Sequence, residues 1–285
     1  MQISFPRCAL AGALLAAPLL VNAEQLGDET VRAWQQYLNG AQARMQSRLN
    51  PSGTFMWLDD QPGRRVQVKQ GKILVAPVAL PGGQPVPNGL IHDWIGAAFI
   101  PNTTIQQFHA VIDDYNQYQQ IYRPTVVASH TISRSGGADS YAMRLLHKTT
   151  FLSWAVDTQD RVQTFPLDAD RAYAISQSLS IREIRNYGKP DEYELSPGQG
   201  DGLIWRLCSI SRYQERDGGV YVELEVIALT RDIPASLHWL VAPLVAKMSR
   251  NSLLASLTQT RSAVCSHQGA VTLAQSPVTL AESIR

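Results

Sequence analysis

Apolar residues recur at steps of three and four between residues 234 and 264, which predicts a long amphipathic helix near the end of the chain. The apolar positions are Leu237, Leu240, Val241, Leu244, Val245, Met248, Leu253, Leu254 and Leu257. Two stretches before it, residues 203–213 and 219–229, alternate apolar and polar side chains as the strands of a β-hairpin do. Because one face of the helix must be covered, we expect it to pack on the sheet that contains this hairpin.

The first part of the chain predicts a helix followed by short strands. Residues 28–49 carry apolar side chains at helical spacing, and Asp28 is placed to cap this helix. Residues 54–58 and 65–78 alternate like strands, with Gly71 interrupting the second. Residues 80–88 contain three prolines and two glycines, which marks the clearest internal boundary. We therefore expect residues 24–87 to form an N-terminal extension of a helix and a hairpin, packed on a domain of residues 88–265.

From residue 89 onward the pattern predicts a strand, two short helices and a series of antiparallel strands. The expected strands are residues 90–100, 126–134, 140–148, 150–156 and 172–184, and the expected helices are 105–115 and 117–122. A tight turn at 157–160 and an extra strand at 161–165 complete this series. Residues 187–202 form a polar loop with two prolines and four glycines, and we expect it to be mobile. This order of elements places the chain in the α+β class.

The N-terminus has the organisation of a secretory signal. An apolar run rich in alanine and leucine, residues 8–21, follows Arg7, and Val21, Asn22 and Ala23 supply small residues before the expected cleavage. The alternative is an uncleaved anchor, but the run has 14 residues, whereas a spanning helix needs roughly 20. We expect cleavage after Ala23, a secreted or periplasmic protein, and no stable membrane insertion afterwards.

Charge and cysteine content narrow the classes of partner. Without residues 1–23 the chain loses only Arg7, so 24 Lys and Arg face 24 Asp and Glu, a formal charge of zero. This balance predicts no nucleic-acid binding. Cys208 and Cys265 remain, and a disulfide or two free thiols are both open. Cys208 alternates in step with Arg206 and Arg212, away from the face that the last helix covers, which argues against a disulfide.

The usual signatures of catalysis are missing from the sequence. It contains no Gly-x-Ser-x-Gly motif, no Cys-x-x-Cys and no histidine pair at the spacing of a helical zinc site, so we predict no catalytic residue, metal or cofactor. Glu223 and Glu225 alternate with valines and a leucine, which places both carboxylates on an outer, solvated face. Two carboxylates at this spacing are also able to share acid–base work, but the solvated face is the preferred interpretation.

The remaining candidates are side chains that alternation places on the inner face of the sheet. They combine large apolar groups with a few polar ones, as ligand pockets do, and an ordinary packed core has the same composition. Two residues of the last helix complete the set. The candidate ligand-binding residues are Met143, Leu145, His147, Trp154, Tyr173, Trp205, Tyr213, Leu244 and Met248.

The order of elements resembles the helix-grip fold of the START and polyketide cyclase superfamily. Three passages carry the resemblance: residues 97–101 leading into 108–115, the strand 219–229, and the helix after Pro234. It implies a curved antiparallel sheet wrapped around a long C-terminal helix, followed by a flexible tail at 266–285. START-like members commonly hold a lipid, sterol or polyketide between sheet and helix. The resemblance therefore implies a protein that binds or carries a hydrophobic small molecule. With the predicted signal, we expect it to be exported, and we expect the polar loop at 187–202 to act as its gate.

Two other functions stay open at this point. The chain is also compatible with a structural or interaction module of the cell envelope that holds no ligand, in which residues 24–87 contact a protein partner that the sequence does not name. A cyclase or aromatase is the third hypothesis, with His147 or Tyr213 moving a proton. A ligand-binding protein without catalysis is the preferred hypothesis.

Overall fold

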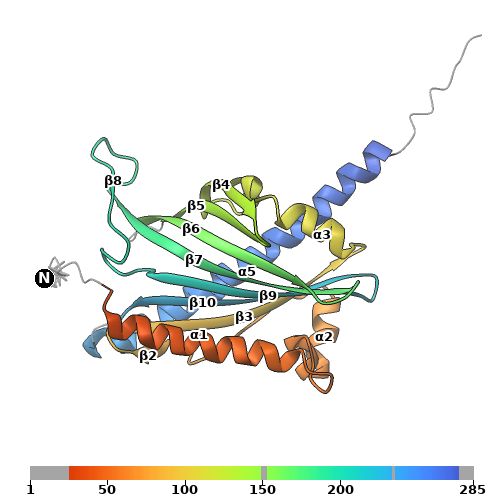
Figure 1. Cartoon of the computed structure of the whole chain (residues 1–285), viewed down its shortest axis with the longest axis horizontal. Coiled ribbons are helices and arrows are strands. Elements are labelled where there is room, and N and C mark those ends of the chain that lie inside the picture. Colours follow the sequence, from red (N-terminus) through yellow and green to blue (C-terminus); the bar gives the residue numbers. More distant parts are fainter. Residues whose placement is uncertain (1–25, 149–152, 233–234, 276–285) are drawn as a thin grey trace, which may run out of the picture.

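The computed structural model describes residues 26–148, 153–232 and 235–275, and most of them form one antiparallel sheet with a helix on each face (Figure 1). Helix α1 (Asp28–Arg48) lies along one face, and helix α5 (Ala235–Gln275) crosses the other. We name these two faces of the sheet the α1 face and the α5 face. The expected signal at residues 1–23 lies outside the described residues.

The sheet is open and antiparallel throughout its paired strands. The strands are β1 (Leu74–Pro77), β2 (Gln84–Val86), β3 (Gly89–Pro101), β4 (Val126–Ser135), β5 (Ala138–Lys148), β6 (Ser153–Pro166), β7 (Arg171–Arg185), β8 (Tyr193–Glu194), β9 (Arg206–Arg216) and β10 (Gly219–Arg231). Their order is β1-β3-β10-β9-β7-β6-β5-β4, with β2 also paired to β3 and β8 to β7. With α5 against this curved sheet, the predicted α+β helix-grip architecture is confirmed.

Short helices connect the strands at one end of the sheet. They are η1 (Trp57–Asp60), α2 (Pro62–Lys69), α3 (Ile105–Ile112), η2 (Tyr115–Gln117) and α4 (Tyr118–Ile121). Helix α3 begins where the sequence predicted, because Thr104 and Gln107 form a capping box in which each side chain bonds the other residue's backbone N–H. Asp28 does not cap α1: it is the first helical residue, and the N-cap is Gly27.

The strands predicted in the N-terminal extension are mostly wrong. Residues 54–58 run into η1, and most of the alternating stretch 65–78 is helix α2 followed by the short strand β1. Pro62 opens α2 at its first turn, where a proline ring favours a helix, and this local signal outweighs the alternation. Strands β1 and β2 both pair with β3, so part of the extension is built into the sheet.

The turn predicted at residues 157–160 is also wrong, because β6 continues through it. Asp157 accepts two hydrogen bonds from Arg144 on the neighbouring strand, at 2.7 and 2.6 Å. Asp160 is buried and accepts a hydrogen bond of 2.6 Å from the Thr158 hydroxyl. Two acidic residues that suggested a turn are therefore held within a strand, Asp157 by an arginine of the neighbouring strand and Asp160 by a nearby threonine hydroxyl.

Helix α5 confirms the longest predicted helix and extends beyond it. It runs to Gln275, so residues 266–275 are helical and the tail predicted to start at residue 266 is wrong over that stretch. Its side chains Leu253 and Leu257 are buried against the sheet. Helix α5 packs mainly on β3 and to a lesser extent on β1, β10 and α3. Gly96 of β3 permits this contact, since a Cβ there would lie 2.7 Å from Leu257.

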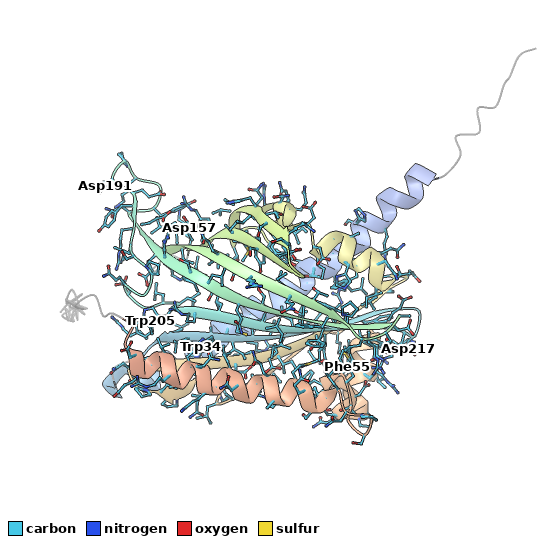
Figure 2. The ribbon with its side chains drawn as sticks, in the orientation of Figure 1. Trp34, Phe55, Asp157, Asp191, Trp205 and Asp217 are labelled. Carbon is cyan, nitrogen blue, oxygen red and sulfur yellow. The ribbon has the colours of Figure 1, made fainter. Side chains whose placement is uncertain are left out.

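The α1 face of the central strands is buried, which corrects the prediction that Glu223 and Glu225 lie on a solvated face. Trp34, Phe55 and Trp205 pack between α1 and the sheet (Figure 2). The α1 face of β10 includes both glutamates, and their side chains are 0% and 7% exposed. Alternation separated the two faces correctly, but it carries no information about a helix that covers the second one.

The charges under α1 are held by a network of ion pairs. Arg212 is 1% exposed, and its Nε donates to Glu223 at 2.8 Å. Glu223 also accepts hydrogen bonds from the backbone of Trp57 and Leu58, at 2.9 and 2.7 Å. Arg44 of α1 bridges Asp93 and Glu225, at 3.0 and 3.1 Å. Because buried charges are costly unless paired, α1 and the 57–60 turn are fixed to the sheet by these contacts.

The two cysteines of the described chain are both free. Cys208 is buried on the α1 face, whereas Cys265 is exposed on α5, which lies across the other face. The sheet separates the two cysteines, so of the two alternatives the structure shows two free thiols.

We expect the Glu223→Gln variant to lose about 3 kcal/mol of unfolding free energy, because it leaves the guanidinium of Arg212 buried beside an uncharged partner. Urea unfolding followed by circular dichroism measures this loss. The matched control is Glu29→Gln at an exposed position on α1, which we expect to change stability by less than about 0.5 kcal/mol. Equal stability of the two variants would contradict a structural role for the buried pair.

Asp93 makes the stability of the fold depend on pH. Burial, and then the nearby Glu225, raise the pKa of Asp93 to about 7. An unfolded aspartate has a pKa of about 3.9, so between about pH 4 and pH 7 the folded state holds a proton that the unfolded state has released. This contribution to stability is complete below that interval and is lost as the pH rises through it.

The Asp93→Asn variant has no group that titrates at this position, so its stability should not show this loss as the pH rises from about 4 to about 7. We expect the stability of the variant, relative to the wild type, to be greater at about pH 8 than at about pH 5. Urea unfolding at the two pH values gives the comparison, and Asp170→Asn at an exposed site is the control. If the difference in unfolding free energy between Asp93→Asn and wild type is the same at both pH values, Asp93 is not the source of the pH dependence.

Candidate functional site

The α5 face of the middle strands is only partly covered. Helix α5 packs chiefly on β3 at one side of the sheet, and side chains of the same face on β5, β6, β7, β9 and β10 keep part of their surface accessible to solvent. We name these residues the open α5 face. They are Met143, Leu145, His147, Trp154, Ser176, Ser178, Leu207, Ser209, Ser211, Leu224 and Val226.

The register of the strands brings these residues together. His147 lies opposite Trp154, and Ser209 lies opposite both Ser176 and Val226. The hydroxyls of Tyr141 and Ser176 are 3.3 Å apart, which joins β5 to the same face as β7. The result is a surface of apolar side chains with rows of serine hydroxyls between them, beneath a helix that contacts mainly one side of it.

A few polar groups on this face lack partners or have shifted acidity. The His147 ring stacks on Trp154 with 5.5 Å between ring centroids, and its Nε2 is buried with no hydrogen-bond partner in the described part of the chain. The same is true of Trp94 Nε1 on β3. Burial raises the pKa of Asp160 to about 6. Unpartnered buried polar atoms are uncommon in proteins, which makes these two atoms candidates for hydrogen bonds to a bound molecule.

Aromatic residues close the end of this face near α3 and α4. Tyr115 stacks on Tyr141 with 4.4 Å between centroids, and the hydroxyl of Tyr122 is 3.0 Å from that of Thr260 on α5. Tyr213 packs against Phe108 of α3, with 4.9 Å between ring centroids. Burial raises the pKa of Tyr213, so its hydroxyl stays protonated at neutral pH. The open part of the face is therefore bounded at this end by a wall of rings.

The structure separates the predicted ligand-binding residues into three groups. Met143, Leu145, His147 and Trp154 lie together on the open α5 face, whereas Tyr213 shares the face but is buried at its closed end. On α5, Met248 is half-buried and Leu244 is 57% exposed.

Tyr173 and Trp205 lie on the α1 face, so the prediction that they share the inner face with the others is wrong. Tyr173 pairs directly with Arg212, and directly paired residues point to the same side of a sheet. A register shift near Asp160 places Ile181 on the other face from Tyr173. Trp205 precedes β9, so the alternation that holds from Leu207 to Tyr213 does not extend to it.

The predicted gate is more tightly built than its composition indicated. Residues 187–202 include β8, which pairs with β7. Arg185 donates two hydrogen bonds to Asp201, at 2.7 and 3.0 Å, and Glu183 accepts from the backbone N–H groups of Asp201 and Gly202, both at 2.8 Å. Whether this segment gates a ligand stays a prediction.

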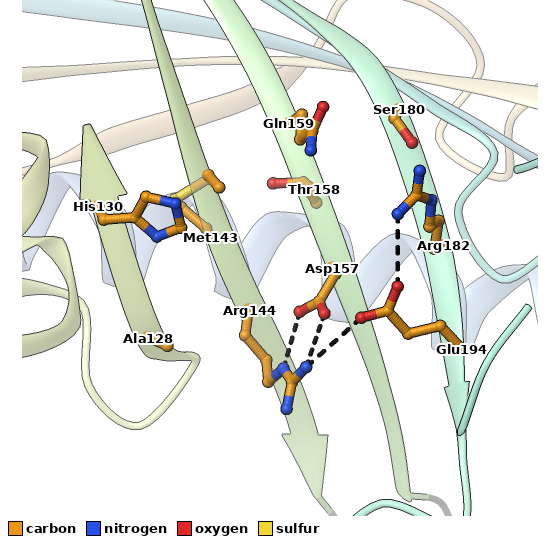
Figure 3. Close-up of a pocket in the computed structure, with 11 residues that line it drawn as sticks. Ala128, His130, Met143, Arg144, Asp157, Thr158, Gln159, Ser180, Arg182 and Glu194 are labelled. Carbon is orange, nitrogen blue, oxygen red and sulfur yellow. Dashed lines mark hydrogen bonds and ion pairs between the residues drawn. The ribbon is translucent and has the colours of Figure 1, made fainter. Parts of the chain in front are cut away.

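A polar depression of about 300 Å³ lies on the other side of the sheet, over β4 to β7 (Figure 3). Its charges pair among themselves: Arg144 binds Asp157 in a two-pronged contact and Glu194 at 3.8 Å, and Arg182 is 3.5 Å from Glu194. Asp157 accepts a hydrogen bond from the protonated carboxyl of Glu194, which raises the pKa of Glu194. Because each of these cations already has an acidic partner, the depression is best described as a satisfied ion-pair surface.

A second pocket, of about 500 Å³, opens where the end of α1 meets the edge of the sheet. It is lined by Arg44, Ser47, Arg48, Gly53, Thr54, Trp57, Pro77, Val78, Ile95, Arg212 and Glu225. Sequence analysis missed it, because its residues come from five separate segments. A usable signal was the pair of charged residues, Arg212 and Glu225, at the middle of two long strands.

In the described ranges, no group of three or more histidine, cysteine or acidic side chains is arranged to hold a metal ion. Of the helices that the structure describes, none is long and apolar enough to cross a membrane.

Comparison with known proteins gives similarities of structure. No family model and no curated protein matches the chain in sequence. Solved structures similar to it include a STAR-related lipid transfer protein fragment from Xanthomonas axonopodis, at 16% identity and a TM-score of 0.45, covering 68% of this chain and 93% of that one. Human StAR-related lipid transfer protein 5 is similar at 11% identity and a TM-score of 0.46, covering 84% and 99%.

An aromatase/cyclase, Zhui from Streptomyces sp. R1128, is similar at 11% identity and a TM-score of 0.41, over 65% of this chain and 98% of that one. The helix-grip architecture of this chain follows from its own strand order and from the position of α5 against β3.

Proposed function

We propose that the protein binds or carries a hydrophobic small molecule, such as a lipid, a sterol or a polyketide-like compound, between the open α5 face and α5. The observation that supports it is the partial exposure of Leu207, Leu224 and Val226, which lie on the α5 face yet keep part of their surface accessible to solvent. Apolar side chains on the inner side of a sheet are normally buried by the protein itself. Here a ligand would bury them.

The composition of the face suits such a ligand. Burying apolar surface stabilises a complex by roughly 25 cal/mol per Å², so a ligand covering about 300 Å² of this face would gain roughly 7 kcal/mol before the costs of binding. The serine hydroxyls and the unpartnered His147 Nε2 supply the few polar contacts that orient a ligand. The interaction-module hypothesis leaves this apolar surface unexplained.

We propose binding rather than catalysis at this face. Tyr213, one of the two residues considered for proton transfer, stays protonated and packs on Phe108 at the closed end. General acid–base work requires a group that gains and loses its proton near the working pH. The arrangement around Tyr213 therefore favours a structural role for its ring.

The experiment compares a leucine on the open α5 face with a leucine of the sheet that is exposed to solvent. We expect Leu207→Glu, on the open α5 face, to lose the ligand, because a buried carboxylate opposes an apolar molecule. Leu179→Glu, at a leucine that is 59% exposed, is the matched control and should keep it. Mass spectrometry of organic extracts from gently purified protein measures the bound molecule.

The outcomes separate the hypotheses. A stoichiometric lipid in wild type and Leu179→Glu, but not in folded Leu207→Glu, supports the proposal. No organic molecule in any of the three folded proteins, together with no uptake of a fluorescent fatty acid, would sink it and favour the interaction module.

We also propose that the protein is exported, with residues 1–23 removed. The position of the expected cleavage supports this, since the first described contact is the backbone N–H of Leu26 bonded to Gly198 at 2.9 Å, and α1 starts at Asp28. Cleavage after Ala23 therefore leaves every described element whole.

We expect N-terminal sequencing of the protein, expressed with its full leader, to begin at Glu24. Replacing Ala23 with a bulky residue should block processing, because signal peptidases require small residues there. Intact mass reports both results. A full-length protein that keeps Met1 and stays with the cytosolic fraction would overturn the proposal.

A further inference from the structure

The pocket under the end of α1 differs from the open α5 face in place and in chemistry. It lies on the opposite side of the sheet, between α1, the 53–57 loop and the edge formed by β1 and β3. Three guanidinium groups, from Arg44, Arg48 and Arg212, line it against the one carboxylate of Glu225. At about 500 Å³ it has the size of a small-molecule site.

Arg212 has an unused donor in this pocket. Its side chain is 2% exposed, its Nε bonds Glu223 at 2.8 Å, and its Nη1 lies 3.6 Å from the sulfur of Met45. Its Nη2 forms an ion pair with Glu225 at 3.6 Å but has no hydrogen-bond partner among the described residues. A buried guanidinium N–H without an acceptor is costly, so the pocket favours a molecule that brings one.

The carboxylates behind the pocket are already engaged. Glu223 accepts hydrogen bonds from two backbone N–H groups and from the Nε of Arg212. Asp60 accepts hydrogen bonds from both Nη atoms of Arg48, at 3.1 and 2.8 Å. Asp93 and Glu225 share a single nitrogen of Arg44, whose side chain remains 46% exposed. The donors left for a ligand are therefore on Arg212 and Arg44.

The other wall of the pocket is apolar. Pro77, Val78 and Ile95 line it from the edge of the sheet, and Trp57 lines it from the turn, where its ring is fixed by the guanidinium of Arg64 at 4.0 Å. A guanidinium group is planar and matches the two oxygens of a carboxylate. The walls thus fit a molecule with an anionic end and a short apolar body.

We propose that this pocket binds a small amphipathic carboxylate, whose oxygens accept hydrogen bonds from Arg212 Nη2 and Arg44 and whose apolar part lies on Trp57, Val78 and Ile95. Glu225 and the negative C-terminal end of α1 both act against an anion here. We therefore expect a dissociation constant on the order of 1 mM for a simple probe. This site is independent of the proposed ligand of the α5 face.

The test uses benzoate as the probe and the whole protein, at an ionic strength held constant with sodium chloride. We expect benzoate, but not added chloride, to shift the indole N–H signal of Trp57 in NMR titrations. Arg44→Gln removes a donor and Val78→Trp fills the apolar side, so each should weaken binding at least about tenfold.

Matched controls carry the same substitutions outside the pocket. Arg32→Gln, at an exposed arginine on α1, and Val66→Trp, at a valine of α2 that is 54% exposed, should bind benzoate within about twofold of wild type. Circular dichroism confirms that all four variants fold. The proposal is overturned if benzoate causes no saturable shift at Trp57, or if both pocket variants bind it as the controls do.

Discussion

The fold depends on matching charges beneath α1. A sheet with one helix can leave its second face to water, but the α1 face of this sheet carries Arg212, Glu223 and Glu225 among buried apolar side chains. Covering such a face is favourable only if each charge meets a partner at hydrogen-bonding distance. Arg44 and the backbone of the 57–58 turn supply those partners, so α1, η1 and the strands become one packed unit.

The long, periodic elements could be predicted from the sequence. Helices α1 and α5, strand β3 and the β9–β10 hairpin have patterns set by their own side chains, and the helix-grip architecture followed from their order. Short elements failed because local signals conflict there. Around Pro62, a helix start overrode a strand-like alternation. At Asp157 and Asp160, partners on other strands or nearby hydroxyls stabilised a strand where the composition indicated a turn.

The candidate site could be predicted only in part, because the alternation pattern is a property of one strand at a time. Alternation within one strand finds residues that share a face, and it grouped Met143, Leu145 and His147 correctly. It does not say which face is covered by which helix, and it fails across a register shift or before a strand begins, as Tyr173 and Trp205 show. The pocket under α1 joins five segments of the chain, and only the three-dimensional arrangement brings them together.

The burial of both faces of β3 also constrains how this protein can change over evolutionary time. This strand has no run of positions that is free to vary, because one set of alternate residues packs under α5 and the other under α1. A descendant that lost residues 28–48 would need hydrophilic replacements at alternate sites of three strands together. Substitutions in α1 should therefore covary with the odd-numbered positions of β10 and be independent of the even-numbered ones.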